Sequence, residues 1–131
     1  MGVGVYNKAR SFQDLDVYKR LYGCMLIVMK EVLTALPREE KFGLADQMRR
    51  ASKAPIAIIA EGYAKKNYRK DWQKYINDAI GECNEMIVHI SCCRDLYGRF
   101  MPIKTLNDLI DSYNICGKQL YKLGQSWKGG I

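Results

Sequence analysis

The sequence predicts an all-α fold, an antiparallel four-helix bundle of up-down topology. Apolar residues recur at alternating steps of three and four over three long stretches, the spacing of helices that bury one face. Pro37 and Pro102 separate such stretches, and proline ends a helix or opens its first turn. No stretch shows strand-like alternation or an Asn-Gly hairpin signal. Four amphipathic helices with short connections pack most simply as an antiparallel bundle.

The length of 131 residues indicates a single domain that buries a core without disulfides. Residues 1–11 contain two glycines and no helical period, which predicts a flexible N-terminal arm. The bundle is predicted to occupy residues 12–128, followed by a tail at residues 129–131.

The first helix is expected to open near Phe12–Asp14 and to end before Pro37, which disfavours the helical conformation in Leu36. Its apolar residues step by three and four, as in the seam of a bundle. The predicted seam is Leu15, Tyr18, Tyr22, Met25, Met29, Val32 and Leu36.

The second helix comes next, with Glu39 and Glu40 near the positive end of its dipole. Pro55 lies inside it and is expected to bend it, because proline removes a backbone hydrogen bond. The helix is predicted to end between Gly62 and Asn67. Its predicted apolar residues are Phe42, Leu44, Met48, Ala51, Ile58 and Ile59.

Asn67 is the predicted N-cap of the third helix, and Gly98 is expected to end it in the left-handed conformation. Pro102 then opens the fourth helix. The predicted seam of the third helix is Trp72, Ile76, Ala79, Cys83, Met86, Ile90, Cys93 and Tyr97. The predicted seam of the fourth helix is Leu106, Leu109, Tyr113, Cys116, Leu120, Leu123 and Trp127.

Some apolar residues fall outside these seams and widen the apolar faces beyond what three neighbouring helices cover. They include Ile27, Val28, Ile80, Ile87 and Ile115. The surplus indicates either a bulky core or packing against further copies of the chain, and we expect self-association.

Positive charge is concentrated between Gln47 and Lys74. This stretch holds eight Lys and Arg residues against Glu61 and Asp71, a net +6 of the formal +7 of the chain. A rigid bundle that carries such a surface is suited to bind a polyanion. The candidate nucleic-acid-binding residues are Arg49, Arg50, Lys53, Lys65, Lys66, Arg69, Lys70 and Lys74.

Aromatic residues lie among these cations, and rings beside Lys and Arg can stack on unpaired bases. They are Tyr63, Tyr68, Trp72 and Tyr75, of which Trp72 also fits the buried seam. No base-reading helix of a known type is present, so RNA or single-stranded nucleic acid is expected rather than a duplex. A solvated face without a partner and an acidic protein partner are the alternatives.

Signals for other chemistry are weak. The chain has one histidine, His89, and five cysteines without a CxxC pair, which favours buried free thiols over a metal or catalytic site. Glu61 and Glu85 are expected to cap a helix or to pair with Arg49 or Arg50. No glycine-rich phosphate loop is present. The sequence therefore predicts a protein that is not an enzyme and that uses no cofactor or metal.

No apolar run reaches the roughly 18 residues of a membrane span, since Lys30 and Glu31 interrupt the best candidate. The N-terminal residues lack the apolar centre of a signal peptide. Together with the odd number of cysteines, this predicts a cytoplasmic protein without a membrane partner.

Four motifs occur together in an order that resembles a known family: FQDLDVY, LPREEKFGLADQMRRAS, IAEGYAKK and AIGECNE. Over residues 12–100 they resemble the bacterial four-helix-bundle family encoded by intervening sequences of large-subunit ribosomal RNA genes. That family is similar to the accessory variability determinant (Avd) proteins of diversity-generating retroelements, and GKQLYKLGQSW resembles an Avd C-terminus. The chain departs from the usual pattern at Pro55, which stands one position early, at Ile58, which replaces asparagine, and at Tyr18, which replaces tryptophan.

The resemblance implies a non-enzymatic bundle that assembles into a ring-like homopentamer. In Avd proteins the basic barrel binds nucleic acid and the reverse transcriptase of the element, which are the partners implied for this chain. Five copies around one axis would repeat the +6 charge as a positive ring. The alternative is an intervening-sequence-type bundle that acts as a protein-interaction oligomer.

Overall fold

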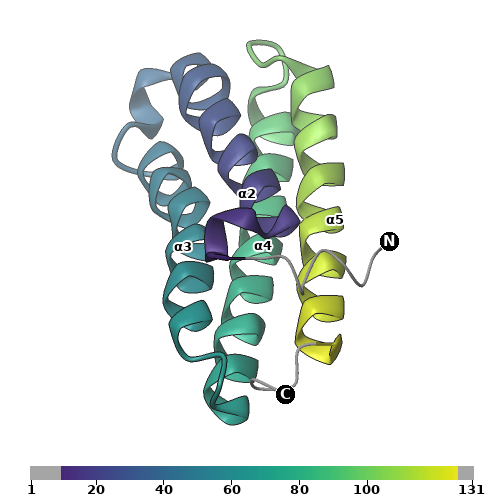
Figure 1. Ribbon diagram of the computed structural model, residues 1–131. Helices are drawn as coiled ribbons and strands as arrows, with labels where there is room; N and C mark the ends of the chain where they lie inside the picture. The colour runs from purple at the N-terminus through teal and green to yellow at the C-terminus, as the bar shows by residue number, and fades with distance from the viewer. Residues whose placement is uncertain (1–9, 127–131) are drawn as a thin grey trace.

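Long helical segments make up the part of the chain that the structure describes. The computed structural model describes residues 10–126, and within this range it contains helices and no strand. The predicted all-α fold is therefore confirmed. In Figure 1 the colour runs alternately up and down the successive segments. Residues 1–9 of the predicted arm and the predicted tail at 129–131 lie outside the described range.

The first segment is assembled from several helical pieces. They are the 3₁₀ turn η1 (Phe12–Asp14), the helix α2 (Asp16–Ile27), the π-helical turn η2 (Val28–Val32) and the 3₁₀ turn η3 (Leu33–Ala35). Ser11 begins η1 with a capping box, in which its hydroxyl accepts the Gln13 N–H and Asp14 accepts the Ser11 N–H. The segment ends before Pro37, as predicted.

The buried face of this segment differs from the predicted seam. Leu15 and Val32 are buried as predicted, but five other seam residues are half-buried or exposed: Tyr18, Tyr22, Met25, Met29 and Leu36. The remaining buried positions are Val17, Leu21, Cys24 and Val28. Two apolar stripes overlap along the segment, and the stripe with the tyrosines stays at the surface, where a phenolic hydroxyl keeps water as a partner.

The second long helix is α3 (Leu44–Ala64), preceded by the 3₁₀ turn η4 (Arg38–Glu40). Glu40 accepts the Leu44 N–H at 3.0 Å, which confirms its place at the positive end of the helix. Pro55 lies inside α3, as predicted, and is buried. Phe42 is 87% exposed, so its predicted core role is wrong, because it lies in the turn before α3 rather than on the helix face.

The last two helices, α4 (Arg69–Tyr97) and α5 (Ile103–Ser126), have the buried faces that the sequence predicted. The buried positions of α4 are Trp72, Ile76, Ala79, Cys83, Met86, Ile90 and Cys93. Those of α5 include Leu106, Leu109, Tyr113, Cys116, Leu120 and Leu123, while Trp127 lies outside the described residues.

Two predicted boundaries of α4 are wrong. Its N-cap is Tyr68 rather than Asn67, and no side chain caps it there. Gly98 has right-handed dihedral angles (φ −53°, ψ −28°) rather than left-handed ones. The glycine is accommodated for a different reason: a β-carbon at this position would lie 2.6 Å from the Arg94 carbonyl oxygen.

The four segments pack around one apolar core. α4 contacts α3 and α5, and α2 contacts the same two helices. The first segment starts part-way along its neighbours in Figure 1, so the described residues at the lower end belong to α3, α4 and α5. Contacts between the ends agree with this course, because Gln73 bonds Gly124 while Arg94 bonds Asn107. This lower end carries most of the predicted site.

Candidate nucleic-acid interface

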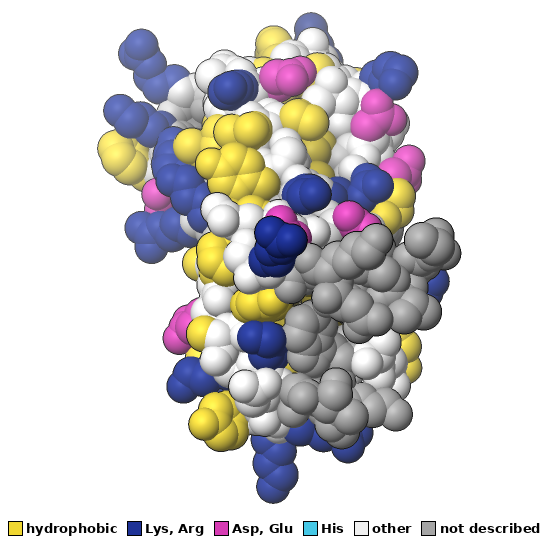
Figure 2. Space-filling view, in the orientation of Figure 1, with side chains coloured by type: hydrophobic (Ala, Val, Ile, Leu, Met, Phe, Trp, Pro, Cys, Tyr) yellow, Lys and Arg dark blue, Asp and Glu magenta, His cyan; other side chains and the backbone are white. Residues whose placement is uncertain are grey.

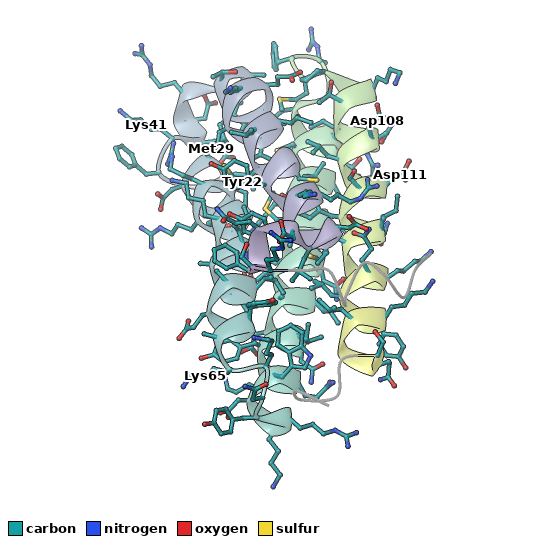
Figure 3. The ribbon with its side chains drawn as sticks, in the orientation of Figure 1. Tyr22, Met29, Lys41, Lys65, Asp108 and Asp111 are labelled. Carbon is teal, nitrogen blue, oxygen red and sulfur yellow. The ribbon has the colours of Figure 1, made fainter. Side chains whose placement is uncertain are left out.

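The eight predicted cations lie in two groups along α3 and the start of α4. The first group is Arg49, Arg50 and Lys53, in the first half of α3. The second group, here called the basic end, surrounds the turn between the helices: Lys65, Lys66, Arg69, Lys70 and Lys74. Twelve positions separate Lys53 from Lys65, which is about 18 Å at the helical rise of 1.5 Å per residue. Figure 3 shows Lys65 near the lower end of the molecule.

Asp46 partly neutralises the first group. Its carboxylate lies 3.5 Å from Arg49 Nη1 and 3.1 Å from Arg50 Nη2. Lys53 is exposed and has no ion pair among residues 10–126. The first group therefore offers a weaker field than its three cations suggest.

The cations of the basic end are mostly free of such pairing. Within the described range, Lys74 alone of the five has an ion pair, at 2.9 Å from Asp78, and the hydrogen bond and charge of Asp78 raise the pKa of Lys74. Lys66 lies over the ring of Tyr63, with 4.3 Å from Nζ to the ring centroid. The other three cations are exposed. The basic end thus keeps four charges for an external anion.

Two glycines bring α3 and α5 close to α4 beside the basic end. A β-carbon at Gly62 would lie 2.6 Å from the Tyr75 β-carbon, and one at Gly124 would lie 3.1 Å from Ile76 Cγ2. Gln73 also donates to the Gly124 carbonyl oxygen at 2.6 Å. These contacts, rather than the alanines of α3, hold the helices that carry the cations in close register.

One of the four interleaved aromatic residues is widely exposed. Trp72 is fully buried, in line with its place in the seam. Tyr75 donates its hydroxyl to Glu61 at 3.1 Å, and Tyr63 is half-buried. Tyr68, between the turn and the first residue of α4, is 65% exposed. Tyr68 is therefore the ring of this set that is best placed to stack on a base.

A surface hollow of about 670 Å³ lies along α4 at the basic end. Its lining residues are Arg69, Lys70, Gln73, Lys74, Asn77 and Asp78. Guanidinium, ammonium and amide groups donate to phosphate oxygens without reading base identity. The hollow can accordingly hold a phosphate backbone.

Beyond the basic end, α4 becomes acidic. Residues 65–74 carry five cations and one acid, a net +4, whereas residues 75–97 carry one cation and four acids, a net −3. Asp78, Glu82 and Glu85 recur at helical spacing, so they share one side of α4. Burial, with these neighbouring carboxylates, raises the pKa of Glu82. The sequence analysis did not single out this acidic band, although a charge count in short windows along the helix finds it.

The glutamates expected near Arg49 and Arg50 have other partners. Glu61 accepts from Tyr75, and Glu85 lies 3.3 Å from His89 Nε2. That expectation was wrong because Glu61 lies about three helical turns further along α3, and Asp46 occupies the arginines. Within residues 10–126 no three His, Cys, Asp or Glu side chains form a group suited to a metal ion.

All five cysteines are free, and four of them are buried. Cys93 donates to the Met48 sulfur at 3.4 Å, so it faces the core rather than His89. Across the described helices, none has the length and apolar character that a membrane crossing requires.

A family comparison identifies the chain. The family model described as "23S rRNA-intervening sequence protein" matches residues 13–122, which is most of the sequence. The chain belongs to this family. The comparisons with curated proteins and with solved structures find no match. Both cation groups of this intervening sequence protein lie inside the matched residues. The resemblance to the intervening-sequence family is confirmed, and the similarity to Avd proteins stays a prediction.

Proposed function

We propose that this intervening sequence protein is a non-enzymatic, self-associating scaffold that binds RNA or single-stranded nucleic acid at its basic end. The observation that carries the proposal is the set of four cations without ion pairs beside the exposed ring of Tyr68. Phosphate contacts supply affinity that depends on salt and tolerates any sequence, and stacking adds a preference for unpaired bases. Asp46 limits the contribution of Arg49 and Arg50 to a secondary one.

The acidic band on α4 supports a defined path for the ligand. A polyanion is attracted to residues 65–74 and repelled by the carboxylates that follow on the same helix. The ligand therefore crosses the end of the bundle instead of following α4 along its length. Figure 2 shows Lys and Arg side chains at this lower end and along the side of the molecule that α3 occupies.

Charge reversal with a matched control tests this interface. The first variant changes Lys65, Lys66, Arg69 and Lys70 to Glu. The control makes the same number of changes at exposed cations in the other half of the bundle: Lys30, Lys41, Arg99 and Lys104. Both variants have the same net charge, so a general effect of the basic isoelectric point is cancelled.

The readout is the affinity for a single-stranded RNA, measured over a series of salt concentrations. We expect the first variant to lose binding and the slope of log affinity against log salt to flatten. The control should retain most of the affinity and of the slope. Equal loss in both variants would contradict the proposal, since it would leave net charge as the only cause.

For the assembly, we propose an antiparallel up-down bundle that forms a ring-like homopentamer, as the resemblance implies. Two edges of the bundle support a contact between copies. Tyr22 and Met29 lie on the α2 and α3 side together with Lys41, whereas Asp108 and Asp111 lie on the α5 side (Figure 3). In a ring, one edge of each copy meets the other edge of the next, which would pair opposite charges around an apolar centre.

Native mass measurement tests the contact. Tyr22 is 44% exposed, and Tyr22→Glu should dissociate the assembly by placing a carboxylate in its apolar centre. Val88→Glu is the control, because Val88 is exposed on α4, outside both edges. A monomeric wild type, or dissociation by Val88→Glu alone, would overturn the assignment of these edges.

The alternative function is a protein-interaction oligomer in which the basic end serves an acidic protein. The exposed apolar residues around Tyr22 favour it as much as they favour self-association. If the similarity to Avd proteins extends to function, a reverse transcriptase is the protein partner to test. Retention of that partner by the charge-reversal variant, together with wild-type RNA affinity, would favour the protein-interaction function.

A further inference from the structure

A pair of cysteines joins α2 to α5 inside the bundle. Cys24 lies on the buried face of α2 and is 3% exposed, and Cys116 lies on α5 and is fully buried. The two thiols are free and are hydrogen-bonded to each other. Their sulfur atoms are therefore adjacent although 91 residues separate them in the sequence.

A polar relay reaches Cys24 from the surface. Ser112 is hydrogen-bonded to the Cys24 sulfur, and its hydroxyl also accepts from Arg20 Nη1 at 3.2 Å. The hydrogen bonds from Cys116 and Ser112, with the positive charge of Arg20, outweigh burial and lower the pKa of Cys24. A lower pKa enriches the thiolate, which is the nucleophilic form of cysteine.

Other buried thiols of the same core are in a different state. Burial raises the pKa of Cys83 to about 12, and it does the same for Cys93. The hydrogen bond to Cys24 and burial raise the pKa of Cys116, which keeps its proton until its neighbour has reacted. Cys24 is thus the activated thiol of the pair, and Cys116 is placed as the resolving thiol.

A small molecule can reach Cys24. A surface hollow of about 540 Å³ lies between α2 and α5, and its wall includes Lys19, Arg20, Gly23, Cys24 and Ser112. A β-carbon at Gly23 would meet no other atom within 4 Å, so the space beside the cysteine is open. An oxidant of the size of hydrogen peroxide fits such a hollow.

We propose that Cys24 and Cys116 form an oxidation site, at which a hydroperoxide converts the two thiols to a disulfide between α2 and α5. The Cys24 sulfur attacks one peroxide oxygen, the O–O bond breaks, and the leaving hydroxide takes up the thiol proton to become water. Cys116 then attacks the sulfenic acid of Cys24, and the hydroxide that leaves takes up the Cys116 proton. Two thiols are oxidised, and one hydrogen peroxide is reduced to two waters.

Peptide mapping of the full chain tests the site. The reduced protein is treated with one equivalent of hydrogen peroxide, alkylated and digested with trypsin. We expect a linked pair of peptides, residues 21–30 with residues 105–118, to form before any other cysteine is modified. Oxidation of Cys92 or Cys83 first, without this linked pair, would overturn the proposal.

Variants separate activation from mere proximity. Cys83→Ser should still form the link, whereas Cys116→Ser should stop at a sulfenic acid that dimedone labels at Cys24. Ser112→Ala removes one hydrogen bond to Cys24 and should slow its oxidation several-fold without preventing folding. An unchanged rate in Ser112→Ala would refute the role of the relay, and an unlabelled Cys24 in Cys116→Ser would refute the proposed order of steps.

Discussion

Tyr97 donates its phenolic hydrogen to the carboxylate of Glu40 and so ties the last turn of α4 to the turn that precedes α3. The same carboxylate accepts the Leu44 N–H, which opens α3. One side chain therefore caps one helix and holds another. The contact lowers the pKa of Glu40 and raises the pKa of Tyr97 to about 12.

The first prediction concerns the pH range over which this contact stabilises the fold. The pKa of Glu40 lies below its ordinary value of 4.5, so its contribution is complete above pH 4.5 and is lost as pH falls further. The pKa of Tyr97 lies above its ordinary value of 10.0, so its contribution is complete below pH 10.0 and is lost as pH rises towards about 12.

The measurement is the thermal midpoint of the wild type and of Glu40→Gln, followed by circular dichroism across pH. The wild type should exceed the variant by a constant margin between pH 4.5 and 10.0, and the margin should narrow on both sides. Glu39→Gln is the control, because it removes the same charge from the neighbouring exposed position. A margin that Glu39→Gln reproduces would show that net charge, and not the bond, is responsible.

Prediction from the sequence succeeded where a helix has one apolar stripe. In α4 and α5 the steps of three and four single out one face, and the structure buries that face. The first segment carries two stripes, and periodicity alone cannot choose between Val17 with Leu21 and Tyr18 with Tyr22. The choice depends on side-chain size and on the need of the tyrosine hydroxyls for water, which only packing against α3 and α5 decides.

The candidate site was foreseen as a composition and not as an arrangement. The charge of residues 47–74 is visible in the sequence, but its division along α3 depends on where the helix ends. The pairing of Asp46 with Arg49 and Arg50 is local, at helical spacings of three and four, and could have been anticipated. The close approach of Gly62 to Tyr75 joins two helices and has no sequence signal.

A second prediction tests which stripe of α2 is the core. Leu21 is fully buried, so Leu21→Ala should cost about 2–5 kcal/mol of unfolding free energy through lost contacts and a cavity. Leu26, on the same helix, is 37% exposed, so Leu26→Ala should cost about 1 kcal/mol or less. Urea unfolding of the two variants measures the difference. Equal costs would mean that the face containing Leu21 is not the one that packs.

A third prediction uses a pair of glycines in helix interiors. Alanine at Gly81 would meet nothing within 4 Å and should stabilise α4 by about 0.5–1 kcal/mol, since alanine orders more readily in a helix. Alanine at Gly62 would lie 2.6 Å from the Tyr75 β-carbon and requires a backbone shift that costs about 1–3 kcal/mol. The same unfolding assay should give opposite signs, and two stabilised variants would contradict the close contact at the basic end.

The last prediction concerns the exposed ring at the basic end. If unpaired bases stack on Tyr68, Tyr68→Ala should weaken the binding of single-stranded RNA by about 1–3 kcal/mol. The substitution removes no charge, so the slope of log affinity against log salt should stay at the wild-type value. A duplex RNA of equal length should show little change, because its bases are already stacked on each other.

Phe100 provides the matched control for this experiment. It is 66% exposed, against 65% for Tyr68, and it lies in the connection between α4 and α5, away from the basic end. Phe100→Ala should leave RNA affinity unchanged, which separates stacking at a defined place from the general loss of an aromatic surface. Equal weakening by both variants, or equal weakening for single-stranded and duplex RNA, would argue that Tyr68 contacts no base and that the basic end acts through charge alone.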